Sequence, residues 1–332
     1  IAGLMELRYI QSLPVERIIN YFESHGFTLK KPTAHKLMEK ASSLFENLYK
    51  CIRQTALSDP YKAADETYYK ILVPEKNSKG KGVRKGYLWV VVGINTRMIY
   101  LLYDDGSRSE KVILNELGGC KGIIQSDGYS PYRKLESDAY PHITRIPCLQ
   151  HIKRKFIDCG EDEPDAKRIV ELINTLYQNE HKHKIGVDGW TVEQNLVHRK
   201  KYAPDILGEI KDVLDDIEER GDLLPKSELK EAITYLRNEW NAVVDIFNYG
   251  DTYLDNNIVE RMNRYISLSR KNSLFFGSHK GAERGAILYT IALTCRMHKV
   301  NLFKYLTDVI NRTAEWQPNT PLEKYRELLP DK

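Results

Sequence analysis

The spacing of hydrophobic side chains divides the chain into helical and strand-forming regions. Residues 1–58 carry apolar side chains at helical spacing, and a second helix is expected from Thr33 to Ile52. Beyond residue 60, short runs rich in β-branched and aromatic residues replace this pattern. The expected strands are residues 64–73, 87–93, 98–103, 121–125 and 143–146. A glycine- and lysine-rich turn (76–86) and a shorter one separate the first three strands, which predicts an antiparallel meander.

A long polar region with helical periodicity follows the fifth strand. The expected helices are residues 164–180, 190–200, 203–220 and 226–248, with glycine or proline between them. Helical spacing resumes at 281–298 and 301–313. Because the polar region separates the strands from the helix that follows residue 255, we interpret it as an insertion in the fold.

The order of meander, helix, strand, helix, strand and helix is that of a ribonuclease H-like core. We therefore predict an α/β fold, in which a mixed five-stranded sheet is flanked by helices and carries a large all-helical insertion. Helical segments are expected at both the N- and C-terminal ends. The predicted divisions are a helical subdomain at 1–58, the first part of the core at 59–159, the insertion at 160–250, the last core helix at 251–300, and a helical tail at 301–332.

Composition limits the class of protein. The 332 residues are 42% hydrophobic, which is typical of a globular protein. The net charge of +4 is small, so a nucleic-acid-binding surface would have to be local. Five scattered cysteines predict free thiols in the cytoplasm. No apolar run approaches the roughly 20 residues that span a membrane, so no membrane partner is expected.

The most informative stretch runs from residue 255 to residue 278. Its first part predicts a helix, on which Asn257, Glu260, Arg261 and Arg264 share one face. Positive charge around an acid favours its ionised form, so Glu260 suits a divalent cation beside a phosphate-binding surface better than it suits proton donation. The alternative is a salt bridge from Glu260 to Arg264 on a solvated helix.

Three acidic residues stand out by their position. Asp65 lies in the first strand, Asp127 follows the fourth strand and precedes a glycine, and Glu260 lies on the late helix. Two sheet-borne carboxylates and one helix-borne carboxylate can hold two Mg²⁺ or Mn²⁺ ions about 3.5–4 Å apart for in-line phosphodiester chemistry. With 46 acidic residues in the chain, only the order and element type select these three.

Six short blocks resemble the IS66 family of transposases. They are Ala-Asp-Glu-Thr at 64–67, Gly-Tyr-Leu-Trp-Val at 86–90, Ser-Asp-Gly-Tyr-Ser-Pro-Tyr at 126–132, Cys-x-x-His-x-x-Arg-Lys-Phe at 148–156, Asn-Asn-x-x-Glu-Arg at 256–261, and Arg-Lys-Asn-x-x-Phe-x-Gly-Ser at 270–278. Each block alone is a weak signal, whereas the combination is specific. The resemblance covers nearly the whole chain, and we expect the family's upstream DNA-end-binding segments to be missing.

The resemblance implies an activity, a cofactor and partners. Asp65, Asp127 and Glu260 would form a DDE catalytic triad that binds two Mg²⁺ or Mn²⁺ ions. The implied activity is metal-dependent cleavage at the ends of an insertion sequence, followed by strand transfer into target DNA. The implied partners are both DNAs and further copies of the chain, because such transposases work as multimers on paired ends. A nucleoid-associated location in the cytoplasm follows.

Basic residues near these blocks are candidates for DNA phosphate contacts. They are Arg261, Arg264, Arg270 and Lys271 beside Glu260, Lys153 and Arg154 in the Cys-x-x-His block, and Arg108, which matches a Ser-Arg pair of the family. A solvated helix face explains Lys153 and Arg154 equally well.

Several neighbouring residues are expected to have supporting roles. Asn257 and His151 would lie beside the metal ligands, whereas Glu66 would face the other side of the strand from Asp65. Cys148 and His151 have the spacing of half a zinc site, but no second pair follows, which favours a half-buried pair at a helix start. Trp89 and the pair Phe275-Phe276 are expected in the core rather than stacked on bases.

Two other functions remain open from the sequence. A transposase-derived protein without catalytic activity would bind DNA or regulate transposition, and it would leave DNA intact in the presence of metal. A glycosidase that uses two carboxylates would need no divalent metal and would have an aromatic-lined cleft.

Overall fold

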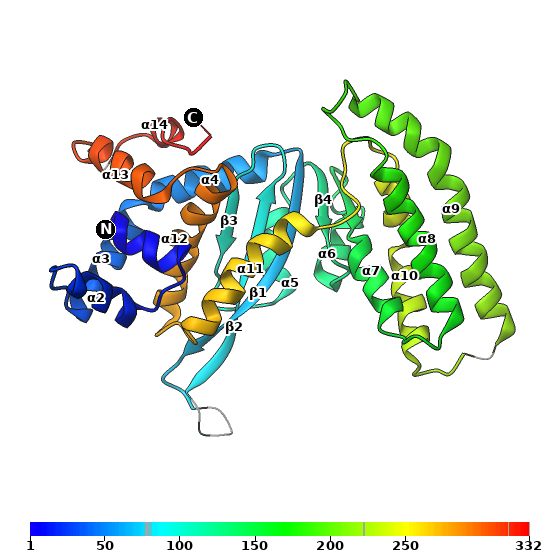
Figure 1. The fold of residues 1–332 in the computed structure, drawn as a ribbon, viewed down its shortest axis with the longest axis horizontal. Helices are drawn as coiled ribbons and strands as arrows, with labels where there is room; N and C mark the ends of the chain where they lie inside the picture. Colours follow the sequence, from blue (N-terminus) through cyan, green and yellow to red (C-terminus); the bar gives the residue numbers. More distant parts are fainter. Residues whose placement is uncertain (77–79, 81, 222, 318, 332) are drawn as a thin grey trace. The chain divides into compact units, whose positions relative to one another are not determined.

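The computed structural model describes residues 1–76, 80, 82–221, 223–317 and 319–331. It is an α/β structure with a mixed five-stranded sheet in the order β3-β2-β1-β4-β5. The chain forms two compact units, one of residues Ile1–Gly122 and Asn257–Lys332, the other of Ile123–Asn256 (Figure 1). No helix among the described residues is both long and apolar enough to cross a membrane.

The first unit contains the predicted antiparallel meander. It consists of β1 (Tyr61–Leu72), β2 (Val83–Gly93) and β3 (Ile99–Leu102). Strand β1 pairs with β2 so that Asp65 is opposite Val90, and β2 pairs antiparallel with β3. The predicted turn is shorter than 76–86, because β2 already begins at Val83, and residues 77–79 and 81 of it lie outside the described part.

Helices account for the rest of the first unit. They are α1 (Ala2–Met5), the π-helix η1 (Glu6–Ile10), α2 (Val15–Ser24), α3 (Lys31–Leu44), α4 (Glu46–Ser58), α5 (Glu110–Leu117), α11 (Asn257–Asn272), α12 (His279–Met297), α13 (Leu302–Thr313) and α14 (Leu322–Arg326). The single helix expected from Thr33 to Ile52 is wrong, because the chain turns at Phe45 and forms α3 and α4. The turn lets α3 contact α2 and α12 while α4 packs on β2 and β3.

Helices pack along the meander and also protect its edge. Helix α11 lies over β1 and β2, whereas α12 packs against β3 (Figure 1). Strand β3 is at one edge of the sheet, where unpaired backbone groups invite association with other strands. The hydroxyl oxygens of Thr290 and Thr294 on α12 accept hydrogen bonds from the backbone N–H groups of Leu101 (2.9 Å) and Ile99 (3.2 Å). The edge is therefore covered by a helix.

The second unit contains the remaining strands and a long helical region. Its elements are β4 (Gly122–Ser126), whose first residue still belongs to the first unit, α6 (Ser130–Arg133), the 3₁₀-helix η2 (Lys134–Glu136), β5 (Ile143–Pro147), α7 (Leu149–Ile157), α8 (Pro164–Glu180), α9 (Val192–Arg220) and α10 (Glu228–Ile246). The predicted helices at 164–180 and 226–248 agree closely with α8 and α10. The predicted divisions of the chain remain predictions.

Helix α9 is continuous through Pro204, although the sequence predicted two helices there. A proline inside a helix removes one backbone hydrogen bond and costs about 3 kcal/mol. Ile206, Leu207 and Ile210, directly after it, are buried, and each buried aliphatic side chain contributes about 1.5–3 kcal/mol. Tertiary packing thus outweighs the local cost.

A buried arginine holds the end of this helical region. The guanidinium of Arg199 on α9 is fully buried and forms an ion pair with Glu180 on α8. It also donates hydrogen bonds to the backbone oxygens of Tyr249 and Thr252, and to the hydroxyl of Thr252 at 2.7 Å. These contacts fix the segment that follows α10.

Candidate active site

In the first unit, strand β1 and helix α11 position two of the three predicted acids. Asp65 lies in the middle of β1 and is half-buried. Helix α11 packs on β1 with Val259, Met262 and Ile266 buried, because these apolar residues recur at helical spacing. Glu260 lies in the first turn of α11 and is also half-buried.

A direct hydrogen bond joins this helix to the strand. Nδ2 of Asn263 donates to Oδ2 of Asp65 at 2.6 Å. Asn263 lies three residues after Glu260, so the two side chains are neighbours on the surface of α11. The other carboxylate oxygen of Asp65 accepts the backbone N–H of Glu66 at 2.8 Å. The amide oxygen Oδ1 of Asn263 is buried and has no hydrogen-bond partner among the described residues.

Glu66 makes a different set of contacts from Asp65. Its side chain is 5% exposed and forms an ion pair with Arg108. The guanidinium of Arg108 also lies 5.1 Å from the ring centroid of Tyr87. Arg108, predicted as a phosphate contact, is thus already engaged by a carboxylate.

The predicted basic residues on α11 fall into two groups. Arg261, Arg264 and Lys271 are exposed, as is Asn257. The salt bridge from Glu260 to Arg264 that the sequence left open is not formed, since Arg264 makes no ion pair with any described residue. Arg270 instead packs on β1.

The guanidinium of Arg270 makes three contacts with strand β1. It lies 4.0 Å from the ring centroid of Tyr68, donates to the backbone oxygen of Tyr68, and donates to the hydroxyl of Thr67 at 3.3 Å. Arg270 therefore fastens the last turn of α11 to the strand that carries Asp65.

In the second unit, Asp127 lies directly after β4 and is half-buried. Its Oδ1 accepts the backbone N–H of Tyr129 at 3.1 Å, which holds the carboxylate at the strand end. The N–H of Gly128 donates to the hydroxyl oxygen of Tyr235 on α10 at 2.8 Å. A Cβ atom at residue 128 would lie 2.5 Å from that oxygen, so a larger residue there would force Tyr235 or the turn to shift.

The pKa of the Tyr235 hydroxyl is affected by Asp127. Burial, followed by the negative charge of Asp127, raises the pKa of the Tyr235 hydroxyl above its ordinary value. The hydroxyl is therefore protonated at neutral pH, and it caps the turn that presents Asp127.

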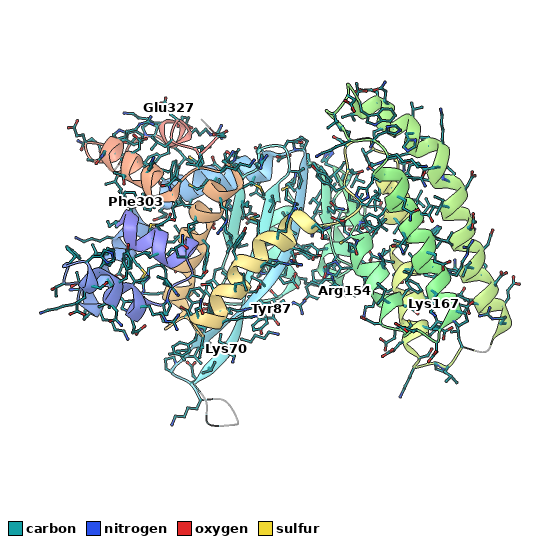
Figure 2. The ribbon with its side chains drawn as sticks, in the orientation of Figure 1. Lys70, Tyr87, Arg154, Lys167, Phe303 and Glu327 are labelled. Carbon is teal, nitrogen blue, oxygen red and sulfur yellow. The ribbon has the colours of Figure 1, made fainter. Side chains whose placement is uncertain are left out.

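Helix α7 carries the Cys-x-x-His block. Cys148 is buried, and its sulfur accepts the backbone N–H of Asn256 at 3.2 Å. All five cysteines are free thiols, as expected. His151 and Lys153 are half-buried. Arg154, which is labelled in Figure 2, is exposed. Burial of the thiol supports the interpretation of Cys148 as a structural residue at the helix start.

The aromatic residues separate into core and surface. Trp89 is fully buried, and Phe276 is buried against Tyr69, with ring centroids 4.2 Å apart. The prediction is wrong for Phe275, which is 47% exposed. The isolated parallel bridge between Ile71 and Phe276 explains the difference, because neighbouring residues of an extended segment point to opposite sides.

Sequence reasoning missed two residues next to the predicted acids. Asn263 was detectable, since it lies one helical turn from Glu260. Tyr235 had no local signal, because it follows Gly128 by 107 residues and reaches it only through folding. The predicted ligands Asp65, Asp127 and Glu260 each offer carboxylate oxygens, which suit Mg²⁺ or Mn²⁺.

Comparison with known proteins points to one family. The family model described as "Transposase IS66 family" matches residues 1–284. Three uncharacterized proteins of Sinorhizobium fredii (strain NBRC 101917 / NGR234) are similar. Protein y4jD is 26% identical, and the match covers 99% of this chain and 64% of y4jD. Protein y4hP is 25% identical, with 96% of this chain and 58% of y4hP covered. Protein y4qI is 29% identical, with 78% of this chain and 49% of y4qI covered.

The chain spans between about half and two thirds of the length of these relatives. The family model covers most of the chain and includes the segments that carry Asp65, Asp127 and Glu260. This chain therefore belongs to the IS66 family of transposases.

Proposed function

We propose that this chain is a DDE transposase that cuts the ends of an insertion sequence and joins them to target DNA. Membership of the IS66 family is the observation that carries this proposal. The proposed partners are the element ends, the target DNA and further copies of the chain, in the nucleoid region of the cytoplasm.

We propose a ribonuclease H-like assignment for the sheet. The order β3-β2-β1-β4-β5, with an antiparallel meander first, supports it. In such a core the catalytic acids come from the central strand, the strand beside it and a late helix. Asp65 on β1, Asp127 after β4 and Glu260 on α11 occupy those elements.

Asp65, Asp127 and Glu260 are the proposed ligands of two Mg²⁺ or Mn²⁺ ions. The residues fit these ions, because carboxylate oxygens are their preferred ligands, and the buried Oδ1 of Asn263 adds an unsatisfied oxygen beside Asp65. When bound, the two ions would supply the positive charge that activates an attacking water or hydroxyl and stabilises the leaving oxygen.

The proposed reaction has two phosphoryl-transfer steps without a covalent enzyme intermediate. In the first, water attacks phosphorus, the bond from phosphorus to the 3′ oxygen breaks, and a 3′-hydroxyl is freed. In the second, that hydroxyl attacks a target phosphodiester, and a target 3′-hydroxyl leaves. Within the chain, the side-chain amide of Asn263 orients Asp65 and the backbone N–H of Tyr129 orients Asp127, while Arg261 and Arg264 hold phosphates.

The test is a nicking and strand-joining assay on DNA with Mg²⁺ or Mn²⁺. Glu260→Gln is compared with the native chain, and Glu23→Gln, at an exposed residue of α2, is the matched control. We expect cutting by the native chain and the control only with metal, and none by Glu260→Gln. Equal cutting by all three would remove Glu260 from the site.

The same assay separates the competing function. A transposase-derived protein without catalytic activity would bind DNA in every variant and would leave it intact with metal. A preassembled end substrate must be included, so that a lack of end recognition is distinguished from a lack of chemistry.

A further inference from the structure

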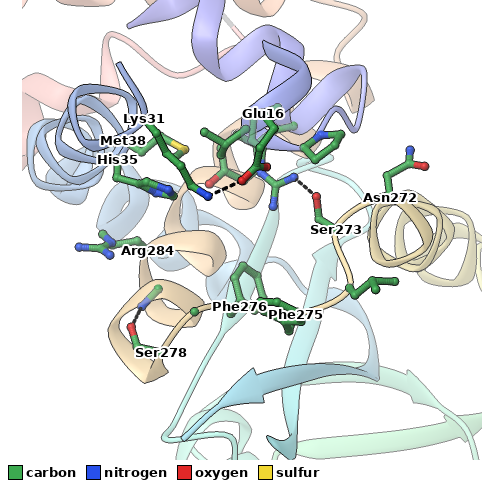
Figure 3. A pocket seen from close by; sticks show the side chains of 17 residues that line it. Glu16, Lys31, His35, Met38, Asn272, Ser273, Phe275, Phe276, Ser278 and Arg284 are labelled. Atoms are coloured by element: carbon green, nitrogen blue, oxygen red, sulfur yellow. Dashed lines mark hydrogen bonds and ion pairs between the residues drawn. The ribbon is translucent and has the colours of Figure 1, made fainter. Parts of the chain in front are cut away.

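A cavity of about 540 Å³ lies in the first unit, beyond the C-terminal end of α11. Its walls come from η1, the starts of α2 and α3, the segment 273–278 and the first turns of α12 (Figure 3). Pockets of about 300–1,000 Å³ are typical of sites for small organic ligands, so this one is large enough for more than a simple ion.

The cavity lining is positively charged. Arg8, Lys31 and Arg284 line it, and Glu16 is the only carboxylate in the described lining. Glu16 pairs with Lys31 (Figure 3). Arg284 pairs at 2.8 Å with Glu39, which does not line the cavity.

His35 also lines the cavity but adds no charge at neutral pH. Burial, followed by the positive charge of Lys31, lowers the pKa of its imidazole below the ordinary value. Because Lys31 pairs with Glu16 and Arg284 pairs with Glu39, the positive charge of Arg8 is the one in the described lining that no carboxylate offsets.

Arg8 has the least compensated charge of the three. It is 8% exposed and donates to two neutral acceptors, the backbone oxygen of Leu13 at 3.1 Å and the hydroxyl of Ser273. Within the described part of the chain it makes no ion pair with a carboxylate. A buried charge is costly unless it is paired, so an anionic ligand is the expected partner.

The floor of the cavity is rigid and partly apolar. Phe276 is anchored to β1 by two backbone hydrogen bonds, to Lys70 (2.8 Å) and from Leu72 (2.9 Å). Its ring packs on Gly285, where a Cβ atom would lie only 2.6 Å from it. The neighbouring Phe275 lines the cavity and remains 47% exposed, which leaves an aromatic face available for stacking (Figure 3).

We propose that this cavity binds an unpaired nucleotide of DNA, with a backbone phosphate on Arg8, Lys31 and Arg284 and the base against Phe275. Cations that track phosphates and aromatic rings that stack on bases are the combination by which proteins bind single strands. The inference rests on the proposed function, because that function supplies DNA as the substrate.

The cavity is separate from the proposed metal site. Glu260 and Asn272, which lines the cavity, are twelve residues apart on α11, or about 18 Å along a helix at 1.5 Å per residue. That distance corresponds to about five nucleotides at 3.4 Å per step. The cavity would therefore hold a strand several nucleotides from the cut.

The test measures DNA binding without any divalent metal, so that cleavage does not enter. Fluorescence anisotropy compares a duplex that carries a single-stranded overhang with a blunt duplex, in EDTA and at several salt concentrations. One variant is a double variant that combines Lys31→Gln and Arg284→Gln. The other carries Phe275→Ala alone. Lys40→Gln on α3 and Leu268→Ala on α11 are matched controls, since both residues are exposed and neither lines the cavity.

We expect the double variant to bind the overhang about tenfold more weakly for each lost contact. The slope of log affinity against log salt concentration should be smaller by about 1.4, because two phosphate contacts on a single strand are lost. Phe275→Ala should weaken overhang binding about fivefold or more and leave blunt duplex binding unchanged. The control variants should match the native chain, and circular dichroism must show that every variant is folded.

Native-like overhang binding by both cavity variants would overturn the proposal. The proposal would also be overturned if the native chain bound a free deoxynucleoside monophosphate as tightly as it binds the overhang. The ligand would then be a free nucleotide rather than a strand of DNA. If the native chain cuts DNA with metal but the cavity variants bind normally, the proposed function stands and this inference fails. If the cavity variants lose overhang binding but the native chain does not cut DNA with metal, the inference about the cavity stands and the proposed function fails.

Discussion

The amide of Asn263 donates a 2.6 Å hydrogen bond to the carboxylate of Asp65, and these two residues are 198 positions apart in the chain. The bond joins the strand and the helix that carry two of the proposed metal ligands. A hydrogen bond of this kind fixes the orientation of a carboxylate that binds metal, which matters because a two-metal site tolerates little misplacement.

The first prediction concerns this hydrogen bond. Asn263→Ala should raise the Mn²⁺ concentration needed for half-maximal DNA cleavage by about 10–100-fold, since loss of a residue that orients a ligand has an effect of that size. Asn311→Ala, at an exposed position on α13, should behave like the native chain. An unchanged metal requirement in Asn263→Ala would mean that Asp65 needs no such support.

A second prediction tests how Gly128 and Tyr235 present Asp127. Gly128→Ala should destabilise the protein by about 1–3 kcal/mol, because the new methyl group would overlap the Tyr235 hydroxyl. Tyr235→Ala removes the overlapping group. Urea unfolding of the two single variants and the double variant measures the coupling.

We expect the double variant to be less destabilised than the sum of the single effects. Additive losses would show that the clash is relieved by movement elsewhere. Cleavage should decline in Gly128→Ala even at saturating metal, since the turn that carries Asp127 is displaced.

A third prediction separates the arginines of α11. Arg264→Gln should weaken DNA binding and lower the slope of log affinity against log salt by about 0.9 on duplex DNA, as expected for one lost phosphate contact. Arg270→Gln should instead lower the unfolding midpoint in urea, because its guanidinium holds Thr67 and Tyr68. A salt slope that changes equally in both variants would contradict this division of roles.

A fourth prediction concerns the pH dependence of stability. Burial raises the pKa of Glu180, but hydrogen bonds from Arg199 outweigh it, so the net pKa is lowered. A carboxyl with a lowered pKa in the folded state contributes stability above its ordinary pKa, about 4.3. That stability should be lost as the pH falls through the folded-state pKa.

The matching substitution is Arg199→Met. It leaves Glu180 without its buried partner and should cost about 3–5 kcal/mol at pH 7. Part of this loss should be recovered as the pH is lowered toward 5, because Glu180 could then protonate. Arg168→Met, which removes an exposed pair with Glu209, should cost no more than about 1 kcal/mol. Urea unfolding at both pH values provides the comparison.

Local pattern was sufficient where one strand or helix could be recognised by itself. The strand at 64–73, the helix at 164–180 and the free thiols could be predicted, because side-chain spacing and the scatter of cysteines are properties of the chain alone. Prediction was wrong where distant packing outweighed local preference. Pro204 stays inside α9, and Phe45 ends α3 early so that α3 and α4 can reach different neighbours.

The sequence by itself determined the family blocks, the order of the strands along the chain and the acids that stand within a strand, directly after a strand and on the late helix. Only the tertiary structure decided which distant groups meet. It joined Asn263 to Asp65, Tyr235 to Gly128, and Arg8 to Ser273 across 265 positions. The physical reason is that periodicity reports the burial of one element's face, whereas hydrogen-bond partners and cavities depend on how several elements pack together.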